Sequence, residues 1–110
     1  MLKTEIYIGL NDQDTKEQRF ETSRYLSLLK NVCISYRVPF SVSVIDGGYI
    51  HENGEYTEEK TLVLSLIDTD EDIVNDIARD LCAFFHQESV LITCGEVRAY
   101  SISEDLKIPR

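Results

Sequence analysis

The alternation of apolar and polar positions along the chain predicts a mixed set of strands and helices. The clearest segment is residues 61–67, which are apolar at nearly every position and so carry apolar side chains on both faces. A strand of this kind usually lies in the middle of a sheet and is covered on both sides. Shorter alternating runs predict further strands at residues 4–10, 40–45 and 89–94.

Apolar residues at three- and four-residue steps predict two amphipathic helices. The first covers residues 14–36 and ends before Pro39, because the residue that precedes a proline avoids the helical region. The second begins near Thr69, which has Asp72 three residues further on as in a capping box, and it runs to about His86.

The connection before the 61–67 strand contains Asn53-Gly54, a dipeptide typical of tight hairpin turns. A turn centred there pairs Ile45 with Leu62, which places serines of one strand beside leucines of the other. A shift of one residue pairs Val44 with Leu62 and matches apolar with apolar. Since a β-bulge produces such a shift, we expect a bulge at Gly47 or Gly48.

After the last strand, Gly95 predicts a bend, and residues 97–102 either continue that strand or form a short extra one. Residues 1–102 then make a single domain, and residues 103–110 form a C-terminal tail. The order strand, helix, strand, strand, helix, strand predicts an α+β protein with the ferredoxin-like split βαβ arrangement: a four-stranded antiparallel sheet with two helices on one face.

In this arrangement one face of the sheet has no helix over it. An exposed apolar face is unusual for a monomer, so we expect a homodimer in which two such faces meet. A partner protein or the C-terminal tail are the other candidates for its cover. The residues expected on this face are Tyr7, Val63, Ile67 and Leu91.

The chain carries 20 acidic and 11 basic residues, a formal net charge of −9. This charge argues against binding to a nucleic-acid backbone or to an anionic membrane surface, and it favours solubility or a basic protein partner. Cys33, Cys82 and Cys94 are far apart and lie in apolar patterns, which indicates buried free thiols. With no apolar run of signal-peptide or transmembrane length, we expect a cytoplasmic protein.

No residue pattern here indicates a catalytic site, a cofactor or a metal ion. His51 and Glu52 at the hairpin, with Tyr49 and Tyr56, could form a polar pocket containing a general base, but a solvated turn is the ordinary interpretation. His86 at a helix end suits the helix dipole better than it suits catalysis.

The acidic residues gather in two places. Asp72, Asp76 and Asp80 recur at four-residue spacing on the second helix, and Glu55, Glu58 and Glu59 lie at the hairpin. A solvated surface explains them simply. The more specific hypothesis is a surface that imitates a row of phosphates and binds a basic protein.

The run from Phe40 to Ser65, with Gly47-Gly48-Tyr49 and Asn53-Gly54, resembles the middle of a family of small uncharacterised bacterial and phage proteins with a ferredoxin-like fold. Gln87-Glu88-Ser89-Val90 at the last strand is similar to the same family. The resemblance implies the fold and a phage or mobile-element origin, and it implies no particular chemistry.

Three functional hypotheses follow. The first is a non-enzymatic acidic interaction module that inhibits a host defence protein through its acidic surface or as a dimer. The second is a small-ligand-binding or enzymatic dimer, with its pocket between sheet and helices or at the dimer seam near Tyr7, Tyr49 and His51. The third is a subunit of a structural assembly.

Overall fold

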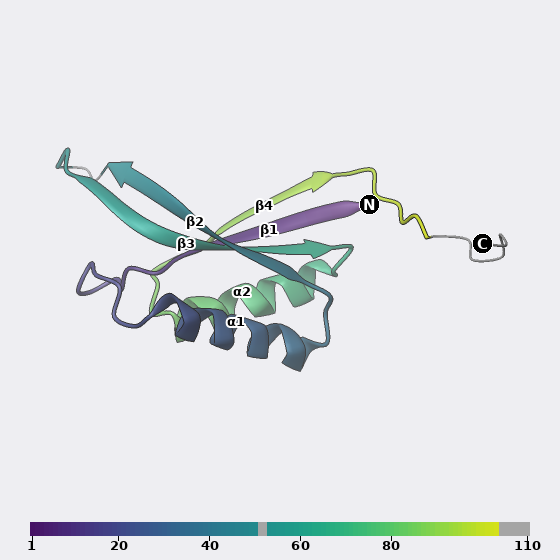
Figure 1. Cartoon of the computed structure of the whole chain (residues 1–110), viewed down its shortest axis with the longest axis horizontal. Helices are drawn as coiled ribbons and strands as arrows, with labels where there is room; N and C mark the ends of the chain where they lie inside the picture. The colour runs from purple at the N-terminus through teal and green to yellow at the C-terminus, as the bar shows by residue number, and fades with distance from the viewer. Residues whose placement is uncertain (51–52, 104–110) are drawn as a thin grey trace, which may run out of the picture.

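The computed structural model describes residues 1–50 and 53–103. Strands and helices follow one another in the predicted order, and both helices cover the same side of the sheet (Figure 1). This confirms the ferredoxin-like α+β fold. The elements are β1 (Leu2–Gly9), α1 (Thr22–Tyr36), β2 (Ser41–Ile50), β3 (Tyr56–Ile67), α2 (Glu71–Phe84) and β4 (Leu91–Glu96).

The sheet has the strand order β2-β3-β1-β4, with all neighbours antiparallel. The 61–67 segment belongs to β3, which is central as its apolar character predicts. Its inward side chains pack with those of β1 against the buried sides of the two helices, and this packing forms the core. The fully buried members from the two strands are Ile6, Ile8, Leu62, Leu64 and Leu66.

The β2–β3 pairing has the shifted register that the apolar side chains favour, with Val44 opposite Leu62. The bulge expected at Gly47 or Gly48 is wrong, because the same register continues without interruption through both glycines. Among the described residues the pairing extends to Ile50 opposite Tyr56. These pairs are symmetric about Asn53, not about the bond between Asn53 and Gly54, and this displaced centre accounts for the shift.

The first helix begins later than predicted, at Thr22. In the preceding loop Asp12 Oδ1 accepts hydrogen bonds from the Asp14 and Thr15 backbone N–H groups, a local bond pattern that competes with a helix. Lys16 has a positive φ of 62°, which also prevents helix there. The helix ends at Tyr36 as predicted.

The second helix is shorter than predicted. It ends at Phe84, and His86 lies beyond it with a positive φ of 53°. At its start Asp70 is the N-cap residue and makes no side-chain capping bond, so the capping box expected from Thr69 and Asp72 is not formed. Of the described helices, neither has the length and apolar composition needed to cross a membrane.

The last strand runs straight through Gly95, so the predicted bend there is wrong. Residues 97–103 are not in a strand, and they lead away from the sheet (Figure 1). Glu96 pairs with Leu2, where β1 begins, and the Val97 N–H adds one backbone hydrogen bond to the Met1 carbonyl oxygen at 2.8 Å before the chain leaves the sheet.

The β2–β3 hairpin extends beyond the rest of the sheet. β1 stops pairing with β3 at Gly9 opposite Thr61, whereas β2 and β3 continue together to Ile50 and Tyr56. This two-stranded extension, residues 46–50 and 56–60, is called the arm below. It projects past the ends of the helices (Figure 1).

Candidate functional site

The residues expected on the open face lie there. Tyr7 is opposite Val63 on one side and Leu91 on the other, and Ile67 is opposite Lys3. Leu91 and Ile67 are 61% and 42% exposed, whereas Val63, in the middle of the sheet, is only 6% exposed. Neighbouring side chains of the sheet therefore cover Val63, while Leu91 and Ile67 remain exposed.

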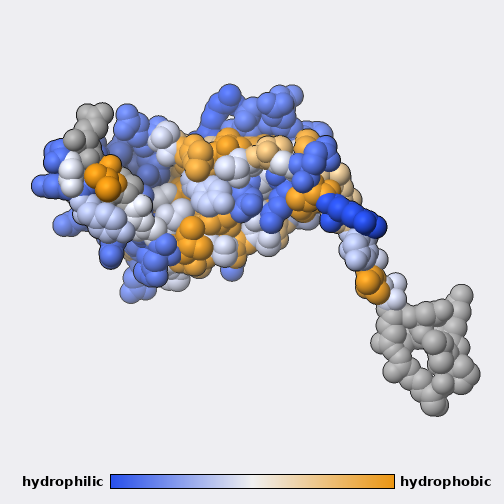
Figure 2. Space-filling view, turned by 90° about the horizontal axis from the view of Figure 1, so that it is seen from above, coloured by the Kyte–Doolittle hydropathy of each residue, from blue (hydrophilic) through white to orange (hydrophobic). Residues whose placement is uncertain are grey.

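Polar side chains separate the apolar ones on this face. Figure 2, which looks onto it, shows apolar patches with pale and polar surface between them. Glu5 accepts a hydrogen bond from the Tyr7 hydroxyl at 3.3 Å, and its charge raises the pKa of Tyr7. The open face is thus a mixed surface with recesses.

The acidic row on α2 is less uniform than its spacing suggests. Asp72 and Asp76 are exposed, and Asp76 pairs with Arg79 at 3.3 Å. Asp80 is half-buried and accepts a hydrogen bond of 2.6 Å from the Tyr36 hydroxyl of α1. This bond raises the pKa of Tyr36 to about 12. Asp80 therefore has a structural partner.

Among the acidic residues of the hairpin, Glu59 differs from the others. Glu55 and Glu58 are exposed, but Glu59 is half-buried, and its Oε2 accepts a hydrogen bond of 3.1 Å from the Asn11 backbone N–H. The Glu59 carboxylate lies against Gly9: a Cβ added to Gly9 would be only 2.6 Å from the Glu59 carboxyl carbon. The glycine and the strand end together fix this carboxylate.

Glu59 lines hollows on both sides of the sheet where the arm begins. One hollow is on the open face, has a volume of about 370 Å3, and is called the Glu59 recess below. The other, of about 590 Å3, lies between the arm and the loop after β1. The Glu59 recess is lined by Tyr7, Gly9, Ile45, Gly47, Gly48, Glu59, Thr61, Gln87, Ser89 and Leu91.

The composition of the Glu59 recess favours an amphipathic ligand that carries positive charge. Tyr7, Ile45 and Leu91 offer apolar surface, and Glu59 offers a fixed negative charge. A few oriented polar groups among apolar side chains are typical of small-molecule sites. A carboxylate held by a backbone N–H can bind a cation or accept a proton.

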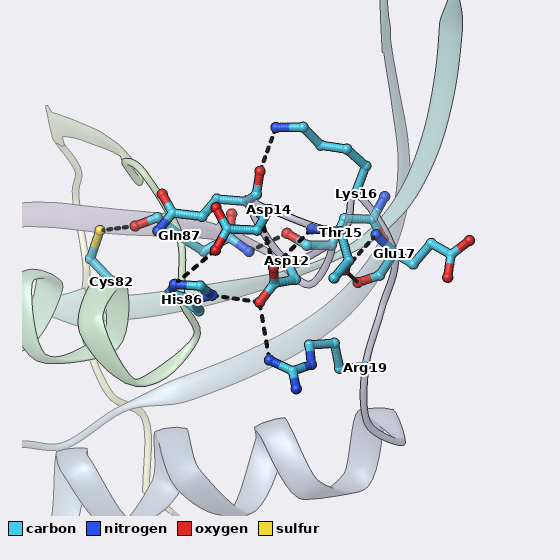
Figure 3. A network of polar contacts seen from close by, with 11 residues as sticks. Asp12, Asp14, Thr15, Lys16, Glu17, Arg19, Cys82, His86 and Gln87 are labelled. Atoms are coloured by element: carbon cyan, nitrogen blue, oxygen red, sulfur yellow. Dashed lines mark hydrogen bonds and ion pairs between the residues drawn. The ribbon is translucent and has the colours of Figure 1, made fainter.

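A second cluster lies beside the recess, where the loop after β1 meets the end of α2 (Figure 3). Asp12 is 3% exposed, and His86 Nδ1 lies 2.6 Å from its Oδ2. This hydrogen bond lowers the pKa of the Asp12 carboxyl far below its usual value, and the Thr15 and Asp14 backbone N–H groups lower it further. Arg19 is 3.7 Å from the same carboxylate.

The donor atoms of Asp12, Asp14 and His86 lie within 4.8 Å of one another, as in a metal site. However, the two ring nitrogens of His86 face different carboxylates, with Nε2 3.5 Å from Asp14. A single ion can take only one of these nitrogens. Because the Arg19 guanidinium already faces Asp12, the arrangement suits an ion-pair network better than a metal ion.

The α2–β4 corner is bonded to the loop after β1. The Gln87 side-chain amide donates to the Asn11 carbonyl oxygen at 2.5 Å, and the Gln13 backbone N–H donates to the His86 carbonyl oxygen at 3.1 Å. Cys82 Sγ in turn donates to the Gln87 carbonyl oxygen at 3.0 Å (Figure 3). These bonds connect α2 to the backbone that holds Glu59.

The cysteines are free, as expected, but only Cys33 is buried, and its burial raises the pKa of its thiol to about 11. Cys82 is half-buried and Cys94 is exposed on β4, so the expectation of three buried thiols is wrong. Cys94 lies on the edge strand β4 opposite Thr4, whose hydroxyl donates to Cys94 Sγ at 3.6 Å.

The polar pocket expected around the hairpin is only partly visible. His51 and Glu52 lie outside the described residues. Tyr56 is 66% exposed, and its hydroxyl end lies over Gly48 on the arm. Sequence reasoning missed Gly9 and Gln87; an isolated glycine in a strand was the available signal for a close approach.

No family model and no curated protein sequence matches the chain. Among solved structures, a phage SAM lyase in complex with S-methyl-5'-thioadenosine is 19% identical, with a TM-score of 0.67, 86% of this chain and 80% of that chain covered. CutA1 from Pyrococcus horikoshii is 14% identical, with a TM-score of 0.57 and coverages of 92% and 87%. The B. subtilis GlnK–ATP complex is 13% identical, with a TM-score of 0.53 and coverages of 88% and 84%. At these identities the likeness establishes the fold alone. One of the proteins that share this fold is a phage protein.

Proposed function

We propose that this chain is a small enzyme that binds S-adenosylmethionine in the Glu59 recess and cleaves it as a lyase. The observation that carries the proposal is the fixed Glu59 carboxylate in a recess of the open face, within a fold shared with a phage SAM lyase. This corresponds to the small-ligand or enzymatic hypothesis, with the pocket at the uncovered face near Tyr7.

The charge of the substrate supports the proposal. S-adenosylmethionine carries a sulfonium cation, and a net charge of −9 favours the approach of a cation. Inside the recess, the Glu59 carboxylate is the group that can face the sulfonium or the ammonium group. Tyr7, Ile45 and Leu91 supply the apolar surface that a nucleoside ring requires.

Cleavage of S-adenosylmethionine requires little from the protein beyond positioning the substrate. Release of S-methyl-5'-thioadenosine breaks the bond between the sulfonium sulfur and the methionine γ-carbon, and the bonding electrons stay on sulfur. The four-carbon fragment then satisfies its γ-carbon either by closing its own carboxylate into a lactone or by losing a β-proton to a base. Glu59 can orient the cation in the first case and can accept the proton in the second.

We further propose that the chain acts as a homo-oligomer, with the homodimer as the simplest form. A two-stranded hairpin is at best marginally stable on its own, so the arm needs support. Leu91 and Ile67 on the open face, and Ile50 on the arm, are exposed apolar side chains that a second copy would bury. A second copy would also close the Glu59 recess from solvent. Light scattering that gives the mass of a monomer at micromolar concentration would contradict this part.

The main experiment is incubation of the purified chain with S-adenosylmethionine, with S-methyl-5'-thioadenosine measured by chromatography and mass spectrometry. We expect product from the wild type and a loss of at least about 100-fold in rate for Glu59→Gln. Glu55→Gln is the matched control, because it removes the same charge from an exposed position of the same hairpin. Absence of product from the wild type, or equal rates for both variants, would refute the proposal.

A second candidate function is the acidic interaction module that inhibits a basic host protein. Asp72 and Asp76 on α2, and Glu55 and Glu58 at the hairpin, are exposed and support it. Capture of such a partner should weaken with rising salt. If substituting Asn for Asp72, Asp76 and Asp80 together leaves capture unchanged, the α2 surface has no part in it.

The cytoplasm is the compartment that we propose, because free cysteines persist in a reducing environment. A phage or mobile-element origin likewise stays a proposal, supported by the phage neighbour of the same fold.

A further inference from the structure

Two stretches that are distant in the sequence meet beside Glu59: residues 11–13, which follow β1, and residues 86–87, which connect α2 to β4. Three bonds join them. They are the Gln87 amide to the Asn11 carbonyl at 2.5 Å, the Gln13 N–H to the His86 carbonyl at 3.1 Å, and the His86 ring to Asp12 at 2.6 Å.

We propose that Gln87 is a positioning residue for Glu59, an inference that rests on the proposed function. Its side-chain amide holds the Asn11 carbonyl, and Asn11 is the residue whose N–H binds the Glu59 carboxylate. Gln87 therefore acts on the reacting groups through the backbone of Asn11.

Asn11 lies past the part of β1 that pairs with β3, at a point where an isolated bridge to Gln18 replaces the regular ladder. The last β1 residue paired with β3 is Gly9, and the Leu10 N–H adds one more bond to the Lys60 carbonyl. From Asn11 onward the chain leaves the sheet. The Asn11 side-chain amide donates to the Glu58 carbonyl oxygen over a long distance of 3.4 Å. Gln87 thus adds a side-chain bond to Asn11 beyond the last residue of β1 that pairs with β3.

Gln87 is itself held firmly at the end of α2. Its backbone N–H donates to the Cys82 carbonyl oxygen at 2.9 Å, and its own carbonyl accepts from Cys82 Sγ at 3.0 Å. Both backbone groups of Gln87 are bonded to the same helical residue, so the side chain starts from a fixed base. The bonded series runs from Cys82 through Gln87 and Asn11 to Glu59.

The kinetic test is Gln87→Ala, with Gln87→Glu as a second variant that keeps the side-chain shape but replaces the donor by an acceptor. For both we expect kcat to fall about 10- to 100-fold while KM for S-adenosylmethionine changes less than about twofold, because the carboxylate remains in the recess but is misplaced. Asn31→Ala, on the exposed surface of α1, is the control and should retain the wild-type values. A kcat within twofold of the wild type for both Gln87 variants would overturn the proposal.

A nuclear magnetic resonance measurement tests the positioning without catalysis. Glu59→Gln should move the Asn11 amide proton resonance upfield, because the bond to a carboxylate is replaced by a weaker one. In the Gln87→Ala or Gln87→Glu background the same substitution should cause at most half of that displacement. An equal displacement in all backgrounds would overturn the proposal. If the wild type forms no S-methyl-5'-thioadenosine, the enzymatic function fails while this coupling still decides the role of Gln87.

Discussion

Replacing Gly9 with Ala should separate function from stability. The added Cβ would lie 2.6 Å from the Glu59 carboxyl carbon, whereas ordinary contacts begin at 3.4 Å. The carboxylate must therefore move by about 1 Å. The Asn11 N–H to Glu59 bond, now 3.1 Å long, does not survive a displacement of that size.

The two effects on stability nearly cancel. Loss of one partly exposed hydrogen bond costs about 0.5–1.5 kcal/mol of unfolding free energy. Alanine in a strand is favoured over glycine by about 0.5–1 kcal/mol, because glycine loses more backbone entropy on folding. The net change should stay within about 1 kcal/mol. A misplacement of 1 Å in a reacting group, by contrast, can lower a rate by about 100-fold.

The assay combines urea unfolding with the rate of S-methyl-5'-thioadenosine formation for Gly9→Ala. Gly95→Ala is the matched control. Gly95 lies on β4, opposite Lys3, on the same face of the sheet as Gly9, and an added Cβ there meets no atom of the described residues within 4 Å. We expect the control to keep its rate and to gain a little stability. A Gly9→Ala variant with a rate within twofold of the wild type, or one destabilised by more than about 2 kcal/mol, would refute the reasoning.

Two further predictions concern the polar pairs. Asp12→Asn should lower the melting temperature by several degrees at pH 7, because the hydrogen bond that His86 donates to the carboxylate is lost. Since folding lowers the pKa of Asp12, its contribution is present above about pH 4 and is lost as the pH falls further, so unfolding curves of the two proteins should converge in acid; parallel curves would contradict this. Tyr36 should be among the last tyrosines to ionise in an ultraviolet titration, because the bond to Asp80 raises its pKa to about 12. Its contribution to stability is fully present below about pH 10 and is lost as the pH rises toward the folded pKa of about 12. Asp80→Asn should move the titration of Tyr36 toward 10, and an unchanged titration would refute the pairing.

The fold could be predicted from the sequence because it depends on patterns that many residues share. The apolar run at 61–67 indicated the central strand, and the order of the elements indicated the topology. Matching Val44 with Leu62 gave the right register even though the explanation by a bulge was wrong. Apolar matching across a strand pair is a repeated signal, whereas the centre of the connecting turn depends on a few residues only.

The errors arose where one side chain decides the local structure. The first helix was predicted to begin at residue 14, but the Asp12 carboxylate accepts hydrogen bonds from the Asp14 and Thr15 N–H groups, and the helix begins only at Thr22. Its other partner, His86, is 74 positions away in the sequence. Local propensity contains no information about a partner at that distance, so the pair could not be predicted.

The candidate site arises from a difference in strand length. β1 stops pairing at Gly9 while β3 extends further along the arm, so that Glu59 lies opposite the point where the chain leaves the sheet. A backbone N–H at a strand end has no ladder partner and can bind a carboxylate instead, as the Asn11 N–H does. A glycine at the last paired position lets that carboxylate approach the sheet. An apolar pattern predicts strands but not where their pairing stops, and for this reason Glu59 could be counted as one acid among several while its particular position became visible only in the folded chain.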